Sequence, residues 1–267
     1  MNKHNIKCII IDIDGTLLHS NGLISGYTKK VISKVVASGI MVILATGRNI
    51  DNAIHISKMC GTSNIVIANN GATIYDYSKN KFIFCNQLDK KTVNNIWNNC
   101  IKYNIDTIYN SYGMRYRNYI NLNKRYNEKN DIVIDGSNEI INDIYQVVLL
   151  SPRRKDLKKC VEKIVNDSVL IGNFSKGSNN IYHVDINSSS VSKGTAIKKI
   201  YNLFKISKEN IMCFGDSIND VDMFNYCKIC VAMKNSMKFI KKQADYITHF
   251  TNDEDGVAKF IEDSIIL

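Results

Sequence analysis

Three kinds of segment are missing from this chain of 267 residues, and each absence excludes a class of protein. No stretch is long and apolar enough to span a bilayer, so we do not expect a membrane protein. The first apolar run begins near Lys7, which leaves no room for a secretory signal ahead of it. No internal repeat or low-complexity linker is present either. With 45% hydrophobic and 22% charged residues, the chain can bury a substantial core in one large or two smaller domains.

The eight cysteines do not form a disulfide framework, because they are scattered and several, such as Cys8 and Cys213, lie inside apolar runs. We therefore expect a cytoplasmic protein. Cys227 and Cys230 have the spacing of half a zinc site, but no second pair or histidine cluster completes it, so zinc is not expected there.

The basic residues are not concentrated in one part of the chain, although the formal net charge is +10. Residues 81–186 hold 16 Lys and Arg against 11 acids, and the rest of the chain holds 19 against 14, an excess of five in each part. A nucleic-acid-binding module would more often gather that charge on one stripe or domain. We therefore expect no nucleic-acid partner.

Two aspartates follow an apolar run near the start of the chain. The run Cys8-Ile9-Ile10-Ile11 is typical of a strand buried on both faces of a parallel sheet, and Asp12 and Asp14 come at its carboxyl end, where such sheets bind ligands. Two neighbouring carboxylates are unfavourable without compensation, which makes a divalent cation their natural partner. Gly15 allows a sharp turn beside them. An ordinary strand-to-loop turn is the alternative interpretation.

Polar residues also follow two other apolar runs. Thr46 ends the run 41–45, so its hydroxyl and the nearby backbone amides can face the same sheet edge and bind phosphate oxygens. Asp216 follows the run 211–214 and can supply an oxygen ligand for Mg²⁺. Lys193 begins a helical pattern, and its ammonium could neutralise both phosphate and the Asp12 carboxylate. Asp220, in the first turn of the next helix, is open to three readings: a metal ligand, a support for Lys193, or a residue favoured by the helix dipole.

Four ordered motifs resemble those of the haloacid dehalogenase superfamily, and more narrowly its Cof-type sugar phosphatases: Asp12-Ile13-Asp14-Gly15-Thr16, Ala45-Thr46-Gly47-Arg48, Ser192-Lys193-Gly194 and Gly215-Asp216-Ser217-Ile218-Asn219-Asp220. The resemblance covers essentially the whole chain and implies that Asp12 attacks phosphorus while Asp14 handles protons. The resemblance implies catalytic roles for Asp12, Asp14, Thr46 and Lys193. It implies that Mg²⁺ is bound by Asp12, by Asp216 and by the backbone carbonyl of Asp14. It also implies supporting or phosphate contacts from Gly47, Asn219 and Asp220, and substrate contacts from Asn70 and Arg48.

The organisation is that of a core interrupted by an insert. We expect an α/β fold in which residues 1–80 and 188–267 form a Rossmann-like core with a parallel sheet, and residues 81–187 form an inserted α+β cap domain. In the resembling subfamily, such a cap closes over the core site and sets specificity. Candidate substrate contacts in the cap, each more simply read as a surface residue, are Arg115, Arg117, Arg125, Lys176 and Asn179. His183 is assigned no role.

Two smaller regions qualify the resemblance. Asn69-Asn70-Gly71 resembles the crossing into the cap, where Gly71 would supply an unusual turn, although a plain turn is an equal reading. Cys230 and Lys234 stand where the subfamily usually has glycine, which could alter one wall of the site.

The expected function is a Mg²⁺-dependent phosphatase of small phosphorylated metabolites, with sugar phosphates favoured by the resemblance. The alternatives are a phosphomannomutase-like phosphotransferase and a non-catalytic regulator that binds phosphate or nucleic acid. We expect a monomer or weak homo-oligomer with a small-molecule partner.

Overall fold

The computed structural model describes residues 6–120, 131–136, 143–177 and 180–266, and the chain divides into two compact units. The core unit comprises Met1–Phe84 and Ser192–Leu267, and the inserted unit comprises Cys85–Val191. No helix in the described ranges combines the length and the apolar character needed to cross a membrane.

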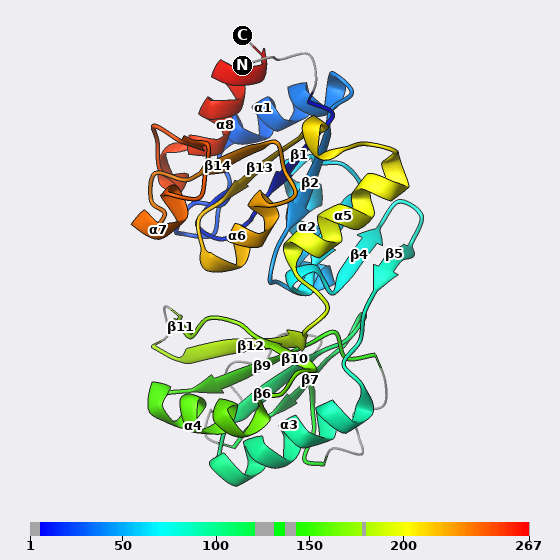
Figure 1. The fold of residues 1–267 in the computed structure, drawn as a ribbon, viewed down its shortest axis with the longest axis vertical. Coiled ribbons are helices and arrows are strands. Elements are labelled where there is room, and N and C mark those ends of the chain that lie inside the picture. Colours follow the sequence, from blue (N-terminus) through cyan, green and yellow to red (C-terminus); the bar gives the residue numbers. More distant parts are fainter. Residues whose placement is uncertain (1–5, 121–130, 137–142, 178–179, 267) are drawn as a thin grey trace. The chain divides into compact units, whose positions relative to one another are not determined.

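The core unit is built on an eight-stranded sheet (Figure 1). Its strands run parallel from β15 to β3, whereas β4 is antiparallel to β3. In sheet order they are β15 (Tyr246–Ile247), β14 (Ile229–Ala232), β13 (Ile211–Gly215), β1 (Cys8–Ile11), β2 (Met41–Ala45), β3 (Ile65–Ala68), β4 (Thr73–Asp76) and β5 (Lys81–Cys85). Sequence analysis did not predict β4, a four-residue strand in which polar and apolar residues alternate.

The apolar run of β1 is continuous because both faces of the sheet are buried. Cys8 and Ile10 pack into one apolar cluster, and Ile9 and Ile11 pack into another on the opposite face. Side chains alternate along a strand, so a strand covered on both sides needs apolar residues at every position.

Helices cover both faces of the core sheet. α1, α2 and α8 contribute to one apolar cluster, and α5, α6 and α7 contribute to the other. Figure 1 shows α1 beside α8, and α5 beside α6. The helices are α1 (Gly26–Ala37), α2 (Ile50–Cys60), α5 (Lys193–Phe204), α6 (Ile218–Phe224), α7 (Lys238–Lys241) and α8 (Gly256–Ile261), with shorter helical turns η2 (Asn69–Gly71), η5 (Lys208–Asn210), η6 (Asn252–Glu254) and η7 (Glu262–Ile266).

The order of the strands creates a switch point beside β1. The chain proceeds from β1 through β2 to β3 on one side, and from β13 through β14 to β15 on the other. Because these strands are parallel, their carboxyl ends share one sheet edge, and ligands of open α/β sheets bind at such a switch point. The expected polar residues after β1, β2 and β13 therefore meet at one edge.

The inserted unit has a seven-stranded sheet among its described residues, with helices on one face. Val147 and Leu149 of β9 pack against α3 and α4, whereas Gln146 of the same strand lies in a polar network with Asn110 and Asp185. The elements are α3 (Lys90–Tyr103), β6 (Asp106–Asn110), β7 (Arg115–Asn118), β8 (Asp131–Val133), β9 (Gln146–Ser151), α4 (Arg154–Ile164), β10 (Val169–Ile171), β11 (Ser175–Lys176) and β12 (Tyr182–Ser188). The predicted α/β class with an inserted α+β domain is thus confirmed.

Candidate active site

Asp12 directly follows β1, and its carboxylate is buried against Lys193. The exposed fraction is 7% for the Asp12 side chain and 0% for the Lys193 side chain. Lys193 Nζ lies 2.5 Å from Asp12 Oδ1 and 2.7 Å from Asp220 Oδ1. Lys193 is the first residue of α5, which begins after Ser192, whose side chain accepts a hydrogen bond from Thr195 N. The start of α5 therefore fixes the ammonium between two carboxylates.

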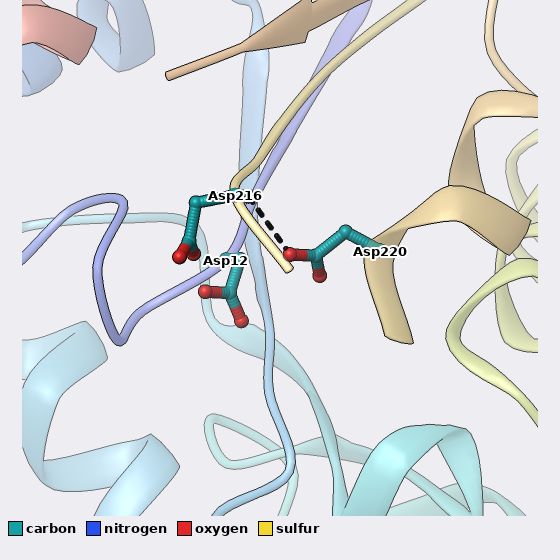
Figure 2. Close-up of side chains that lie close together, drawn as sticks. All are labelled: Asp12, Asp216 and Asp220. Carbon is teal, nitrogen blue, oxygen red and sulfur yellow. Dashed lines mark hydrogen bonds between the residues drawn. The ribbon is translucent and has the colours of Figure 1, made fainter. Parts of the chain in front are cut away.

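Asp216 and Asp220 come from the loop and helix that follow β13. Figure 2 shows their carboxylates side by side with that of Asp12, and one oxygen from each of the three lies within 4.8 Å of the others. Asp220 Oδ2 accepts hydrogen bonds from the amides of Asp216 and Ser217, both at 2.9 Å. Thr16 Oγ1 donates to Asp216 Oδ1 at 2.9 Å. Hydrogen bonds from the loop after β1 and from the loop after β13 therefore fix the carboxylates of Asp216 and Asp220.

The charges in this cluster do not balance. Burial raises the pKa of Asp12 well above its usual value, and the carboxylates of Asp220 and Asp216 add to that shift while Lys193 opposes it. Burial and the Asp220 carboxylate also raise the pKa of Asp216 to about 6. Burial alone would lower the pKa of Lys193, but the carboxylates of Asp12 and Asp220 raise it. Three carboxylates around one ammonium would be stabilised by a further cation.

The donor set fits Mg²⁺, which prefers oxygen ligands and usually takes one or two carboxylates together with water and phosphate. Both oxygens of Asp220 accept hydrogen bonds, from Lys193 and from backbone amides. Asp12 and Asp216 each accept from described residues through Oδ1. A Cβ at Gly15, where φ is +78°, would lie 2.5 Å from Asp216 Oδ2, so glycine permits this close approach. Among the three carboxylates, those of Asp12 and Asp216 are therefore the best candidates to bind a divalent cation.

A second, uncharged group of residues lies at the same sheet edge and consists of Thr46, Gly47, Asn70 and Asn219. Thr46 is buried, and its hydroxyl oxygen accepts from Arg48 N at 3.1 Å, which leaves the hydroxyl hydrogen able to donate to a ligand. Asn70 N donates to the Thr46 carbonyl at 2.9 Å, and Asn219 Nδ2 donates to Asn70 Oδ1 at 3.1 Å. A Cβ at Gly47 would lie 2.9 Å from Asn70 Oδ1, so glycine permits this close approach.

The turn at Asn70 and Gly71 is an unusual one. Asn70 has φ 55° and Gly71 has φ 95°, both in the left-handed region. A Cβ at Gly71 would overlap the carbonyl oxygen of Ser192. Gly71 therefore lets η2 pack directly against the start of α5, which carries Lys193, and the expected unusual turn is present.

Asp14 differs from Asp12 in its surroundings, because its side chain is 59% exposed. Arg48 donates to it through both arms of its guanidinium, from Nε to Oδ2 at 2.8 Å and from Nη2 to Oδ1 at 2.6 Å. Arg48 lies just ahead of α2, which begins at Ile50 and is capped by Asn49, whose side chain accepts from Asn52 N. The residue therefore precedes the helix, and its contact with phosphate stays a prediction.

Sequence analysis gave no role to two residues that shape this edge. Thr16 bonds to Asp216, as above, and Asn235 Nδ2 donates to the Gly15 carbonyl at 2.7 Å. Asn235 follows β14 just as Asp216 follows β13, so the same argument from strand ends could have identified it.

The candidate contacts of the inserted unit lie in different environments. Arg115 and Arg117 of β7 are buried rather than on the surface, with their Nε atoms 2.7 Å and 2.6 Å from the two carboxylate oxygens of Asp131. Buried arginines need such a partner, which the sequence pattern did not reveal. Lys176 on β11 is exposed, and its Nζ lies 5.4 Å from the centre of the Tyr182 ring. Arg125 and Asn179 lie outside the described residues. The substrate contacts stay predictions.

The unusual residues near β14 are accommodated by local hydrogen bonds. Cys230 is buried, and its thiol donates to the Phe224 carbonyl at 3.2 Å and lies 3.6 Å from the Cys227 carbonyl. Lys234 N donates to Thr248 Oγ1 at 2.9 Å.

The core unit places carboxylates at the switch point of its sheet, and an α+β unit is inserted between its two segments. The sequence profile of the haloacid dehalogenase-like hydrolases matches residues 9–261, and the chain belongs to that family. These comparisons confirm the Cof-type assignment and the expectation that the protein is a phosphatase of this family.

Relatives and solved structures match the chain over almost its whole length. It is 30% identical over 257 residues to the 5-amino-6-(5-phospho-D-ribitylamino)uracil phosphatase YcsE of Bacillus subtilis, covering 96% of this chain and 95% of the relative. A haloacid dehalogenase-like hydrolase from Bacteroides thetaiotaomicron has the same fold, with a TM-score of 0.85 at 20% identity, covering 97% and 99% of the two chains. A subclass IIB sugar phosphatase also has this fold, with a TM-score of 0.80 at 23% identity, covering 96% and 98%.

Proposed function

We propose that the chain is a Mg²⁺-dependent phosphatase that hydrolyses small phosphorylated metabolites through an aspartyl phosphate on Asp12. The observation that carries the proposal is the buried cluster in which Lys193 lies between Asp12 and Asp220 with Asp216 beside them. Such a cluster combines a nucleophilic carboxylate, a fixed cation for phosphate oxygens and a place for a divalent metal.

In the first half of the reaction, an Asp12 carboxylate oxygen forms a bond to phosphorus and the bond from phosphorus to the ester oxygen breaks. The departing oxygen keeps the electron pair and takes a proton from Asp14. In the second half, water gives a proton to Asp14 as its oxygen attacks phosphorus, and the bond to Asp12 breaks to release inorganic phosphate. The exposed position of Asp14 suits proton exchange with water, whereas the buried Asp12 is shielded from it.

The other residues would act on the charge of the transferring group. Lys193 and the Thr46 hydroxyl would bind its equatorial oxygens, and Asp220 would keep Lys193 oriented. Mg²⁺, held by Asp12, Asp216 and the Asp14 carbonyl, would supply neutralisation of phosphate charge. Gly47 and Asn219 would shape the pocket around the phosphate.

Two classes of substrate deserve testing first. The Bacillus subtilis relative is named for a phosphorylated ribitylaminouracil, and one solved structure of the same fold is a sugar phosphatase. The phosphorylated ribitylaminouracil and the sugar phosphates are both phosphate monoesters of polyhydroxylated carbon chains. We propose that the inserted unit sets the choice between them, with Arg48 and Asn70 as candidate contacts in the core unit.

The decisive experiment is phosphate release from a panel of sugar phosphates, alditol phosphates, nucleotides, phosphoglycolate and pyridoxal phosphate, with Mg²⁺ or EDTA. Asp12→Asn is the control. We expect Mg²⁺-dependent turnover in the wild type and none in Asp12→Asn. Equal phosphate release by the two proteins would overturn the nucleophile assignment.

Two alternatives make different predictions. A phosphomannomutase-like phosphotransferase would be strongly activated by a sugar bisphosphate. A non-catalytic regulator would show salt-sensitive RNA or DNA binding that survives Asp12→Asn. The complete set of carboxylates favours the phosphatase over the non-catalytic regulator, and the response to a sugar bisphosphate separates it from the phosphotransferase.

A further inference from the structure

The loop that follows β1 carries Asp14, whose side chain moves protons in the proposed reaction. The loop makes one bend of its own, in which the Ile13 carbonyl accepts hydrogen bonds from Leu17 N and Leu18 N, both at 3.0 Å. The carbonyls of Gly15 and Leu18 take no part in that bend, and both accept hydrogen bonds from side chains of distant segments. The position of Asp14 therefore depends on residues outside the loop.

Two asparagines supply these outside hydrogen bonds. Asn235, which follows β14, donates from Nδ2 to the Gly15 carbonyl at 2.7 Å. Asn252, the first residue of η6, donates from Nδ2 to the Leu18 carbonyl at 2.9 Å. Asn252 N also donates to Asn235 Oδ1 at 3.1 Å, which joins the two side chains. Asn235 and Asn252 thus form an asparagine clamp that holds the loop at two of its carbonyls.

The two residues of the asparagine clamp differ in burial. Asn252 is 5% exposed, whereas Asn235 is exposed and lines the same pocket as Asp14. Removal of a buried polar side chain leaves its partners unsatisfied and destabilises the fold. Removal of an exposed side chain usually changes the free energy of unfolding little. The clamp can therefore be weakened at Asn235 without unfolding the protein.

Packing does not fix Asp14, because its side chain is 59% exposed. Arg48 holds the carboxylate through two hydrogen bonds, and Asn235 holds the carbonyl of the next residue, Gly15. A general acid must lie within hydrogen-bond reach of the oxygen that it protonates, and a displacement of about 1 Å can cost on the order of 10²-fold in rate. A shift of the turn at Gly15 would therefore weaken proton transfer by Asp14.

We propose that Asn235 is a positioning residue for the proton transfers of Asp14. It fixes the turn at Gly15 from outside the loop, and Asn252 holds Asn235 in place. The inference rests on the proposed phosphatase function and deepens it. The role differs from that of Arg48, which contacts the Asp14 carboxylate itself, because Asn235 acts on the backbone that carries it.

The test compares leaving groups that differ in their need for a proton. An alkoxide needs an acid as it departs, whereas p-nitrophenolate departs without one. The substrates are p-nitrophenyl phosphate and glucose 6-phosphate, the latter replaced by whichever alkyl phosphate of the panel above the wild type hydrolyses fastest. A second measurement, hydrogen exchange at the amides of Leu17 and Leu18, reports whether the loop is held.

The variants remove the Asn235 donor in two different ways. Asn235→Leu keeps a similar size and removes both hydrogen bonds of the side chain. Asn235→Asp keeps the acceptor for Asn252 N and places an oxygen against the Gly15 carbonyl. The matched control is Asn202→Leu, at an exposed position near the end of α5 opposite Lys193.

We expect kcat/KM for the alkyl phosphate to fall by about three- to tenfold in both variants of Asn235, because a hydrogen bond that positions the acid is lost. The value of kcat/KM for p-nitrophenyl phosphate should stay within about twofold of the wild type. Exchange at Leu17 and Leu18 should become several-fold faster, roughly in step with the lost bond, while the urea midpoint stays nearly unchanged. Asn202→Leu should match the wild type in every measurement.

The positioning role requires both the faster exchange and the difference between the two substrates. Either result without the other would overturn it, as would an equal loss of kcat/KM with the alkyl and the p-nitrophenyl ester. In each of these cases the wild type still hydrolyses the alkyl phosphate, so the proposed function survives. If the wild type releases phosphate from none of the alkyl phosphates, the proposed function fails and the positioning role fails with it.

Discussion

Each unit of the molecule buries a charged cluster, and the two clusters have opposite compositions. In the core unit, one ammonium, Lys193, lies among three carboxylates. In the inserted unit, one carboxylate, Asp131, lies between two guanidinium groups. The carboxylates of the core converge at a loop edge, whereas the arginines of the insert lie along β7 and hold it to β8 through Asp131. Burial of charge therefore does not by itself indicate a reaction centre, and it is the acidic excess at a strand end that favours the core cluster as the candidate site.

The largest expected effect contrasts a carboxylate from each cluster. Asp12→Asn should lower turnover by on the order of 10⁴-fold or more, because it removes the nucleophile. Asp131→Asn should lower the free energy of unfolding by about 3 kcal/mol, because it breaks a buried ion pair, and should leave turnover of acetyl phosphate largely intact. Phosphate release and urea unfolding measure the two effects. Comparable loss of turnover in both variants would remove the contrast between the clusters.

A second prediction exchanges a cation in each cluster for methionine. Lys193→Met should lower kcat by roughly 10²- to 10³-fold, since one fixed electrostatic group is lost. It should also lower the free energy of unfolding in EDTA by about 3–5 kcal/mol, because Asp12 and Asp220 stay buried without their ammonium.

Magnesium separates that variant from its counterpart in the insert. Added Mg²⁺ should restore part of the lost stability of Lys193→Met, because a cation can again occupy the carboxylate cluster. Arg117→Met removes a cation from the other cluster and should show no change in its response to Mg²⁺ relative to the wild type. Urea unfolding with Mg²⁺ and with EDTA checks this. An equal Mg²⁺ effect on both variants would place the ion elsewhere.

A third prediction concerns pH. The pKa of Asp216 is raised to about 6 in the folded protein, so protonated Asp216 stabilises the fold at low pH, and this contribution is lost as the pH rises from about 4 towards 6. In EDTA, Asp216→Asn should therefore gain stability relative to the wild type over this range, by on the order of 2 kcal/mol. Mg²⁺ should reverse the gain, because the wild type then keeps its ligand. Unfolding curves of both proteins at pH 4 and pH 6.5 provide the measurement, and a difference that does not change with pH would contradict the assignment.

The sequence allowed the core sheet and its site residues to be predicted for one physical reason. Parallel strands buried on both faces are continuous apolar runs, and their carboxyl ends coincide, so Asp12, Thr46 and Asp216 could be placed together before any contact was known. Lys193 followed from its position at a helix start. The assignment of roles to these residues stays a prediction.

Other features depend on contacts that no local pattern encodes. The guanidinium of Arg48 bonds to Asp14, which lies 34 residues earlier in the chain. Thr16 bonds to Asp216 across 200 residues, and Asn252 reaches the Leu18 carbonyl across 234. β4 pairs antiparallel to β3, and its four residues are too few to give a clear sequence pattern. Side-chain direction and tertiary pairing decided these features.

The smallest expected effect contrasts two arginine–aspartate pairs, one in each unit. The Arg48–Asp14 pair is solvent-exposed, whereas the Arg117–Asp131 pair is buried. Exposed pairs contribute roughly 0–1 kcal/mol and buried ones cost about 3–5 kcal/mol to break. Arg48→Gln should therefore barely change the urea midpoint, while Arg117→Gln should lower it clearly.

The effect of Arg48 should instead be seen in catalysis, because its guanidinium holds the Asp14 carboxylate through two bonds. We expect Arg48→Gln to lower kcat by about tenfold with alkyl phosphates, whose leaving oxygen needs a proton. With p-nitrophenyl phosphate, whose leaving group departs without one, kcat should change by less than about twofold if Arg48 acts through Asp14. Arg48→Lys keeps the charge but not the two-armed geometry, so it should resemble Arg48→Gln. If Arg48 binds the phosphate itself, both classes of substrate will lose activity equally, and Arg48→Lys will retain more of it than Arg48→Gln.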